Sequence, residues 1–336
     1  MNNHKQPQIG LVLAGGGAKG AYQAGALRYL AEIGLQPHII AGTSIGALNG
    51  AVLAVNTPFT DAVQRLDYIW TQLGETRVIN PHQNLAIATL NHTAKTFIPT
   101  FRHWLIDFAL KTGISNDNKA LLDPQPVETI LKSEIDFQAL MNGIELWATV
   151  FPSLKIPGLD YDWIIDIIRS KTGTKALWLC AQDCHDDETL YNLLLASAAI
   201  PLAFPQREVN GKYYVDGALG DNIPLGALAA RGCSHAIVIH LNSGAIWNRH
   251  DFSEQTVIEI RPSVTINKSN LPLIGEINSI LDFSPENIAN LKLIGYQDAR
   301  RCLEPILQTL VTVKLQRQVE ESLFYSTQRL LEDEPL

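Results

Sequence analysis

The sequence lacks any hydrophobic run long enough to cross a membrane. A transmembrane helix needs about 20 consecutive, mostly apolar residues. The apolar run at residues 9–14 ends at Gly15, and it is also too short for the hydrophobic part of a signal peptide. We therefore expect no signal peptide and no transmembrane segment, and we predict a cytoplasmic protein.

Positive charge is scarce as well. The 336 residues include 26 Lys and Arg against 34 Asp and Glu, which gives a formal net charge of −8. A broad basic surface for nucleic acid is therefore excluded. The same acidity weakens attraction to anionic lipid surfaces, so we expect any membrane contact to be peripheral and mainly apolar.

Cysteine is too sparse for a disulfide framework. The four cysteines are Cys180, Cys184, Cys233 and Cys302, a number and spacing that fit a reducing compartment. Cys180, Cys184 and His185 resemble part of a metal site, but a zinc site needs four ligands and the other two cysteines are distant in sequence. We expect neither a metal nor an organic cofactor.

What the sequence does contain is an alternation of short apolar runs with helical periodicities. With 46% hydrophobic and 18% charged residues, the chain can bury a large core. The expected strands are residues 9–13, 38–41, 144–150, 176–180, 212–215, 235–241 and 256–260. The expected helices are residues 18–33, 47–55, 190–199, 224–230 and 285–331, with a mostly helical pattern over 60–140. This order predicts an α/β fold with a largely parallel sheet.

The sharpest local motif is GTSIG at residues 42–46, between an expected strand and an expected helix. A nucleophile elbow needs small residues on both sides of its serine, because the turn is strained and the neighbouring chain is close. Gly42 and Gly46 meet that requirement around Ser44. The alternative is an ordinary helix cap, a position that serine favours.

A second motif, GGGAKG at residues 15–20, begins the first expected helix. Backbone N–H groups at such a helix start can stabilise a developing oxyanion. The motif also fits the G-x-G-x-x-G pattern of a dinucleotide site, which expects an acidic residue after the next strand. The chain has PHIIA at residues 37–41 instead. A nucleotide-binding oxidoreductase is therefore the less favoured alternative.

A third motif places Asp216 at the end of an expected strand, followed by Gly217 and Ala218 and then by Asn222. Two small residues after the aspartate leave its carboxylate accessible to a partner. The alternative is a turn or helix-cap aspartate, the commoner role of an isolated Asp-Gly pair.

With these motifs, the sequence resembles the patatin-like phospholipases, a family of bacterial lipid acyl hydrolases related to plant patatin. The resemblance covers residues 9 to about 241 and, less specifically, 293–299. It depends on four motifs in family order: AGGGAKGAYQAGAL (14–27), GTSIGALNG (42–50), ASAAIPLAFP (196–205) and DGALGDNIP (216–224). It implies a three-layer fold with a central, mostly parallel sheet flanked by helices, and a lipid or phospholipid substrate.

The resemblance also implies a Ser-Asp dyad, with Ser44 as nucleophile, Asp216 as base and no histidine between them. Gly15, Gly16 and Gly17 would form the oxyanion hole, mainly through the N–H groups of the last two. Lys19 stands where relatives carry Arg or Lys, and Ala218 where many carry Gly. The remaining motif positions implied to support the site are Gly20, Gly217 and Asn222.

An aspartate with its ordinary pKa of about 3.9 is a poor base at pH 7. We therefore predict that Asp216 is more buried than a surface turn requires. A Ser-His-Asp triad is the competing arrangement, and His240, at the end of an expected strand, is the histidine to test. A protein that binds lipid without cleaving it is a further alternative.

Because residues from Gly15 to Asp216 must converge on one site, we predict one domain over residues 7–310. It has a helical insertion near 80–140, a candidate cap at 151–174 and a helical tail at 311–336. Two segments are weaker candidates for lipid contact. One is the aromatic stripe Phe97, Phe101, Trp104, Leu105 and Phe108, which is more typical of a core, and the other is residues 159–168. Oligomeric state is not predicted.

Overall fold

The computed structural model describes residues 8–55, 57–75, 125–154, 173–201, 204–243, 247, 249–266, 279–280 and 282–332. The aromatic stripe at 97–108 and the segment 159–168 lie outside these ranges, as does most of the expected insertion.

The fold is built on one eight-stranded sheet with the order β5-β6-β3-β2-β1-β7-β8, and with β4 also paired to β3. The run from β3 to β8 is parallel, whereas β4, β5 and β6 pair antiparallel. The strands are β1 (Ile9–Leu13), β2 (Ile39–Thr43), β3 (Glu145–Pro152), β4 (Leu177–Cys180), β5 (Arg207–Val209), β6 (Lys212–Asp216), β7 (His235–Ile239) and β8 (Thr256–Ile260). The predicted α/β class with a mostly parallel sheet is confirmed.

The sequence analysis missed β5, a strand of three residues that is too short to show an alternating pattern. It forms a hairpin with β6 through Asn210 and Gly211, whose φ angles of 51° and 74° are both positive. An Asn-Gly pair is the strongest short sequence signal for such a turn.

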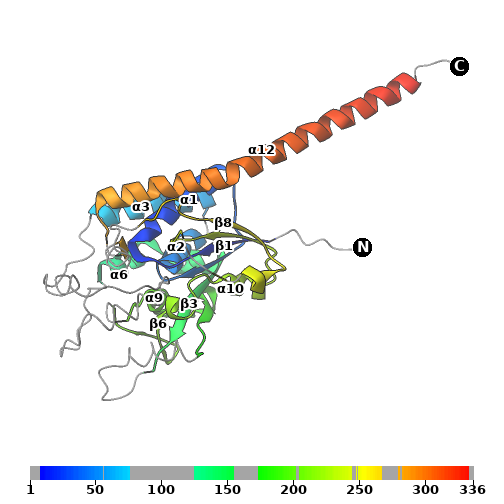
Figure 1. Ribbon diagram of the computed structural model, residues 1–336. Coiled ribbons are helices and arrows are strands. Elements are labelled where there is room, and N and C mark those ends of the chain that lie inside the picture. The colour runs from blue at the N-terminus through cyan, green and yellow to red at the C-terminus, as the bar shows by residue number, and fades with distance from the viewer. Residues whose placement is uncertain are drawn as a thin grey trace.

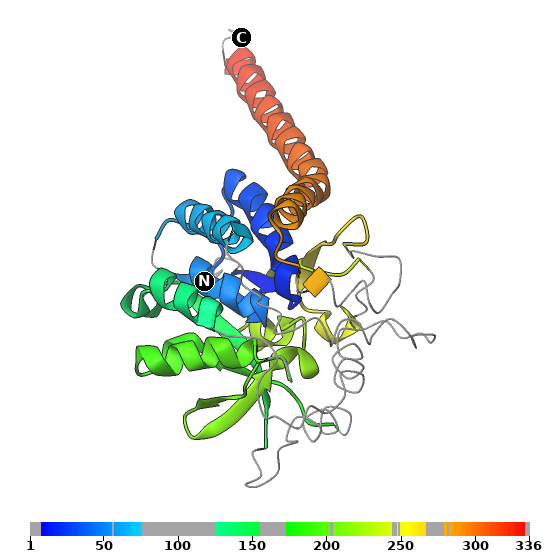
Figure 2. The same ribbon diagram turned by 90° about the vertical axis from the view of Figure 1, so that its left-hand side faces the viewer.

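Both faces of the sheet are buried, because alternate residues of its central strands enter two different hydrophobic clusters. Leu11 and Leu13 belong to the cluster that includes α1, α2 and α3, whereas Val12 packs with Leu225 and Leu228 of α10 on the other face. The result is the predicted three-layer arrangement, seen in two views in Figures 1 and 2.

Most helices coincide with the periodic segments of the sequence. The α-helices are α1 (Gly20–Glu32), α2 (Ile45–Ala54), α3 (Phe59–Glu75), α6 (Gln125–Glu134), α7 (Phe137–Met141), α9 (Asp187–Ser197), α10 (Leu225–Ala230) and α12 (Pro285–Glu332). Short 3₁₀ turns are η1 (Gly17–Lys19), η3 (Ala181–Asp183), η4 (Gly217–Leu219) and η5 (Arg249–Phe252). Within the described ranges, no helix combines the length and hydrophobicity that a bilayer span requires.

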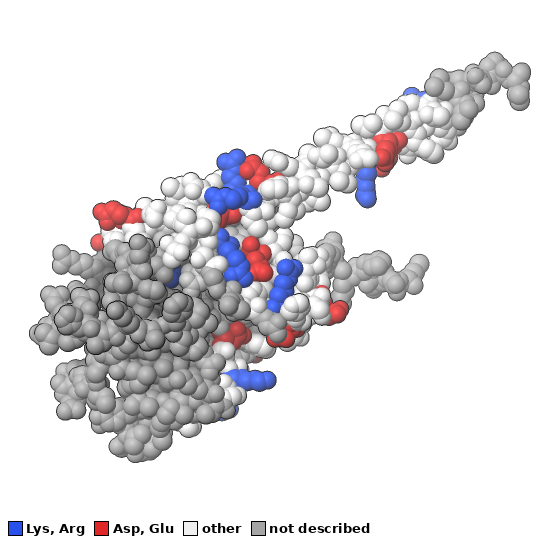
Figure 3. All heavy atoms as spheres, viewed as in Figure 1, with Lys and Arg blue, Asp and Glu red and all other residues white. Residues whose placement is uncertain are grey.

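The long helix α12 crosses α1 and then extends away from the body of the molecule (Figure 1). The crossing is close, because a side chain at Gly25 or Gly295 would collide with the backbone of the other helix. The projecting half exposes apolar side chains such as Leu323 and Phe324, and Figure 3 shows few charges on its visible face. The domain boundary drawn at residue 310 falls inside this one helix.

Candidate active site

Strand register brings the two predicted catalytic residues to neighbouring positions. Thr43, the last residue of β2, pairs with Thr149 of β3, and Asp216, the last residue of β6, pairs with Val150 of β3. Ser44 follows Thr43 directly. The two segments, more than 170 positions apart in the sequence, therefore flank the same point of β3.

Ser44 occupies a strained backbone conformation, with φ 56° and ψ −127°, between β2 and α2. Such a conformation costs a non-glycine residue about 1–3 kcal/mol. The flanking glycines are required by close packing: a Cβ at Gly42 would lie 2.4 Å from the Gly46 carbonyl oxygen, and one at Gly46 would lie 2.2 Å from that of Leu13. The turn has the geometry of a nucleophile elbow, and no side-chain cap bond to Ser44 is present.

The side chain of Ser197 holds this strained turn in place. Its hydroxyl accepts a hydrogen bond from the Ser44 N–H at 3.0 Å and donates one to the Thr149 carbonyl at 2.7 Å. Ser197 is fully buried at the end of α9. The sequence analysis quoted it within ASAAIPLAFP but gave it no role, because its partners are distant in sequence.

Replacing Ser197 with Ala is expected to lower kcat about 10- to 100-fold and leave KM nearly unchanged. The buried Ser44 N–H would lose its acceptor, at a cost of about 1–3 kcal/mol, and the elbow would lose its anchor. Steady-state kinetics combined with thermal unfolding tests this. A fall in unfolding temperature with an unchanged kcat would show that the hydrogen bond serves stability alone.

Asn222 fixes the glycine loop beside Ser44. Its side-chain carbonyl accepts from the Gly15 N–H at 3.1 Å, and its amide donates to the Gly15 carbonyl at 3.3 Å. Among the described residues, no acceptor is bound by the N–H groups of Gly16 or Gly17. Two donors at the start of η1 are thus available to a ligand, at the place where the motif predicted an oxyanion hole.

The other predicted support positions lie around the same loops. Lys19 is buried in η1, and Gly20 begins α1 against Ile45 and Trp70. Gly217 and Ala218 form η4, directly after Asp216.

Asp216 is fully buried, as predicted. Its Oδ1 accepts from the Ala218 N–H at 2.9 Å, while its Oδ2 has no hydrogen-bond partner. Burial raises the pKa of Asp216 to about 7, and the Ala218 N–H and the nearby Ser44 hydroxyl oppose that rise. Ser44 is thus close enough to affect the carboxyl, although the contact does not have hydrogen-bond geometry. Catalytic hydrogen bonds are often long before substrate binds.

His240 is also buried, but its contacts lie elsewhere. Its Nε2 is 2.9 Å from Oε2 of Glu259, and its ring lies beside Trp247. Burial, together with Arg261, lowers the pKa of His240. In the described part of the chain, no contact joins His240 to Ser44 or Asp216.

An apolar pocket opens beside Ser44, with walls from α2, α3 and α6 and from the end of α9. It encloses about 1140 Å³ of empty space, including the part open to solvent. Among the described lining residues, the charged ones are Glu134 and Arg207, which form ion pairs with Arg65 and Glu128 respectively. The pocket suits a mainly hydrocarbon ligand.

A buried polar network supports the wall of this pocket. Trp70 donates through its indole N–H to Asn49 at 3.0 Å, and the Asn49 amide donates to Gln23 at 2.8 Å. Three helices, α1, α2 and α3, are thereby joined behind Ser44.

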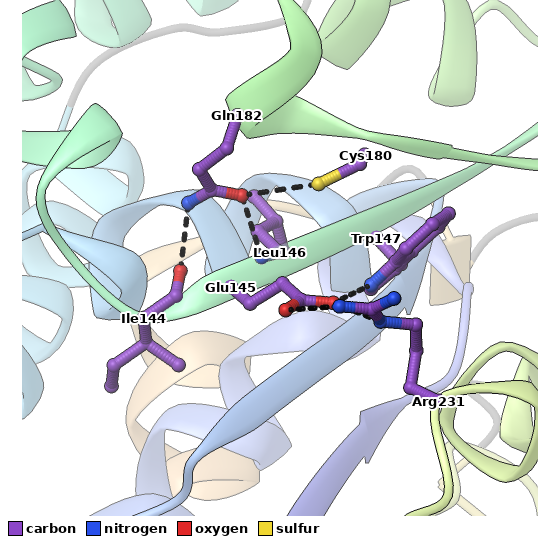
Figure 4. A network of polar contacts seen from close by, with 7 residues as sticks. All are labelled: Ile144, Glu145, Leu146, Trp147, Cys180, Gln182 and Arg231. Atoms are coloured by element: carbon purple, nitrogen blue, oxygen red, sulfur yellow. Dashed lines mark hydrogen bonds and ion pairs between the residues drawn. The ribbon is translucent and has the colours of Figure 1, made fainter.

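The cysteine cluster makes protein contacts. Cys180 donates to the side-chain carbonyl of Gln182, which also accepts from the Leu146 N–H (Figure 4). Within the ranges that the structure covers, no group of three or more His, Cys, Asp or Glu side chains is arranged to hold a metal ion.

Comparisons with known proteins agree with the motifs. A family model described as patatin-like phospholipase matches residues 11–229. Among curated proteins, the chain is 51% identical over 63 residues to a putative patatin-like phospholipase domain-containing protein of Caenorhabditis elegans, covering 19% of this chain and 6% of that protein. It is 61% identical over 46 residues to patatin-like phospholipase domain-containing protein 7 of Rattus norvegicus, covering 14% and 3%. The matches thus span only a small part of these relatives.

Solved structures with a similar arrangement include VipD from Legionella pneumophila, with 14% identity and a TM-score of 0.44, covering 90% of this chain and 67% of that one. ExoU from Pseudomonas aeruginosa has 16% identity and a TM-score of 0.41, covering 90% and 53%.

Proposed function

Because the chain belongs to the patatin-like phospholipase family, we propose that it is a serine acyl hydrolase that cleaves fatty acyl esters of phospholipids or related lipids. The observation that carries this proposal is the pairing of a strained serine with a fully buried aspartate at an apolar pocket. Ser44 and Asp216 form the proposed catalytic dyad.

In the proposed reaction, the Ser44 hydroxyl attacks the ester carbonyl carbon while Asp216 accepts its proton. Oδ2 is the receiving atom, since Oδ1 already accepts from the Ala218 N–H. The alcohol leaves with a proton returned by Asp216, and the acyl group remains on Ser44. Water, deprotonated by the same carboxylate, then releases the fatty acid.

Asp216 suits this role because burial raises its pKa to about 7. A base is most effective when its pKa is near the working pH, where it is largely ionised and still accepts a proton readily. An exposed aspartate with an ordinary pKa would be a far weaker base.

The proposed oxyanion hole consists of the Gly16 and Gly17 N–H groups at the start of η1. These donors are fixed in advance, because Asn222 clamps the preceding Gly15 on both its N–H and its carbonyl. Fixed donors stabilise the tetrahedral oxyanion without reorganising during the reaction.

Hydrolysis of a fluorogenic phospholipid by wild type and by His240→Ala tests the dyad against a triad. We expect the wild type to release fatty acid and His240→Ala to retain at least about a third of kcat/KM, since a general base contributes about 10²–10⁴-fold. Circular dichroism controls for folding, because His240 is buried beside Glu259. A loss of 100-fold or more in a folded variant would instead make histidine the base, by the same range.

A further inference from the structure

The walls of the pocket share one spacing. Each of three helices lines it at positions i, i+3, i+4 and i+7: α2 from Ile45 to Val52, α3 from Leu66 to Leu73 and α6 from Val127 to Glu134. This is the spacing of a single helix face. The pocket is therefore a channel bounded by two turns of each helix, about 10 Å long.

The contacts between helices give the channel a direction. Ile45 follows Ser44, so the first turn of α2 marks the reactive end. Trp70 of α3 bonds to Asn49 of α2, and the two helices run antiparallel, which brings Leu66 toward Val52, away from Ser44.

The same end of the channel is reached by the C-terminal end of α6. Glu134 forms its ion pair with Arg65, the residue before Leu66. At the other end of α6, Glu128 pairs with Arg207. Glu134 therefore lies at the far end of the channel from Ser44.

We propose that the fatty acyl chain lies along this channel and that Glu134 limits its length; the inference depends on the proposed hydrolase function. Carbon–carbon bonds of about 1.5 Å advance an extended chain by about 1.3 Å each, so about 10 Å accommodates eight carbons. A longer chain brings its terminal methylenes against a carboxylate whose side chain is 14% exposed. Contact with hydrocarbon would remove water from that charge, which is unfavourable.

The test is a series of p-nitrophenyl esters from four to sixteen carbons, each kept below its micelle-forming concentration. For the wild type, kcat/KM should rise about fourfold per added methylene until the channel is filled, near eight carbons, and then stop rising. Two variants, Glu134→Leu and the nearly isosteric Glu134→Gln, remove the charge at the far end. Glu134→Leu should raise the ratio of twelve-carbon to eight-carbon activity by about tenfold or more.

Arg65→Met is the matched control, because it breaks the same ion pair from a residue that does not line the channel. It should leave the ratio at the wild-type value. Val52→Phe should shift the break toward shorter chains, whereas Val63→Phe, at a buried position of α3 outside the lining, should not.

Equal ratios in the Glu134 and Arg65 variants, or a wild-type profile with no break, would overturn the channel assignment. Four-carbon ester hydrolysis that depends on Ser44 would then still support the proposed function. If no ester of the series is cleaved, the proposed function itself fails, and the channel assignment with it.

Discussion

Ser44→Ala is expected to lower kcat/KM by at least about 10⁴-fold, because no neighbouring group replaces the attacking oxygen. Some rate above that of water should remain, since the Gly16 and Gly17 donors and the apolar pocket are unchanged. The measurement is hydrolysis of a four-carbon p-nitrophenyl ester, which needs little of the acyl channel. Thermal unfolding should show a folded variant.

The Ser197 variant provides the matched comparison for Ser44→Ala. Both changes remove one hydroxyl from the same buried contact, but only Ser44 is proposed to bond to substrate. The account therefore requires a far larger loss at Ser44 than at Ser197. Comparable losses would contradict it, because they would indicate a shared structural effect.

Asp216→Asn is expected to lose activity and gain stability. Burial raises the pKa of Asp216 to about 7, so the folded wild type holds a proton that the unfolded chain releases near pH 4. Wild-type stability from this group therefore falls as pH rises from about 4 to 7, and the full penalty persists above pH 7. Three pKa units correspond to up to about 4 kcal/mol. Asparagine carries no charge and avoids that penalty.

Urea unfolding of wild type and Asp216→Asn at several pH values measures this effect. The variant's advantage should grow from pH 4 to 7 and then level off. Asp186→Asn is a control with the opposite sign, because the N–H of Thr189 lowers the pKa of the exposed Asp186. Parallel stability curves for wild type and Asp216→Asn would show that the pKa of Asp216 is not raised.

The activity of the wild type should follow the same ionisation. Because the base must be deprotonated, kcat/KM is expected to rise with pH through about 7 and then reach a plateau.

The parts of the site that could be predicted from sequence are those where local geometry restricts composition. Gly42 and Gly46 were predictable because the backbone of other segments approaches each within a side chain's radius. Positions of this kind accept no larger residue, so the motif survives as a pattern in a single sequence. The alternation of strands and helices was predictable for a similar reason, since burial imposes its periods locally.

What the sequence could not provide depends on contacts between distant segments. The role of Ser197 follows from its hydrogen bonds to Ser44 and Thr149, 153 and 48 positions away. Glu134 belongs to no motif, and its place at the end of the channel follows from how α6 packs on α3. Ser-Asp proximity itself required the register of β3 with both β2 and β6.

The most direct test of the proposed mechanism is covalent trapping with an alkyl fluorophosphonate, whose phosphorus is attacked by an activated serine with loss of fluoride. The account predicts one phosphonyl group per chain, located at Ser44 by mass spectrometry of peptides. Labelling should be absent in Ser44→Ala and strongly slowed in Asp216→Asn. Labelling of another residue, or hydrolysis that continues in Ser44→Ala, would contradict the assignment of Ser44 as the nucleophile.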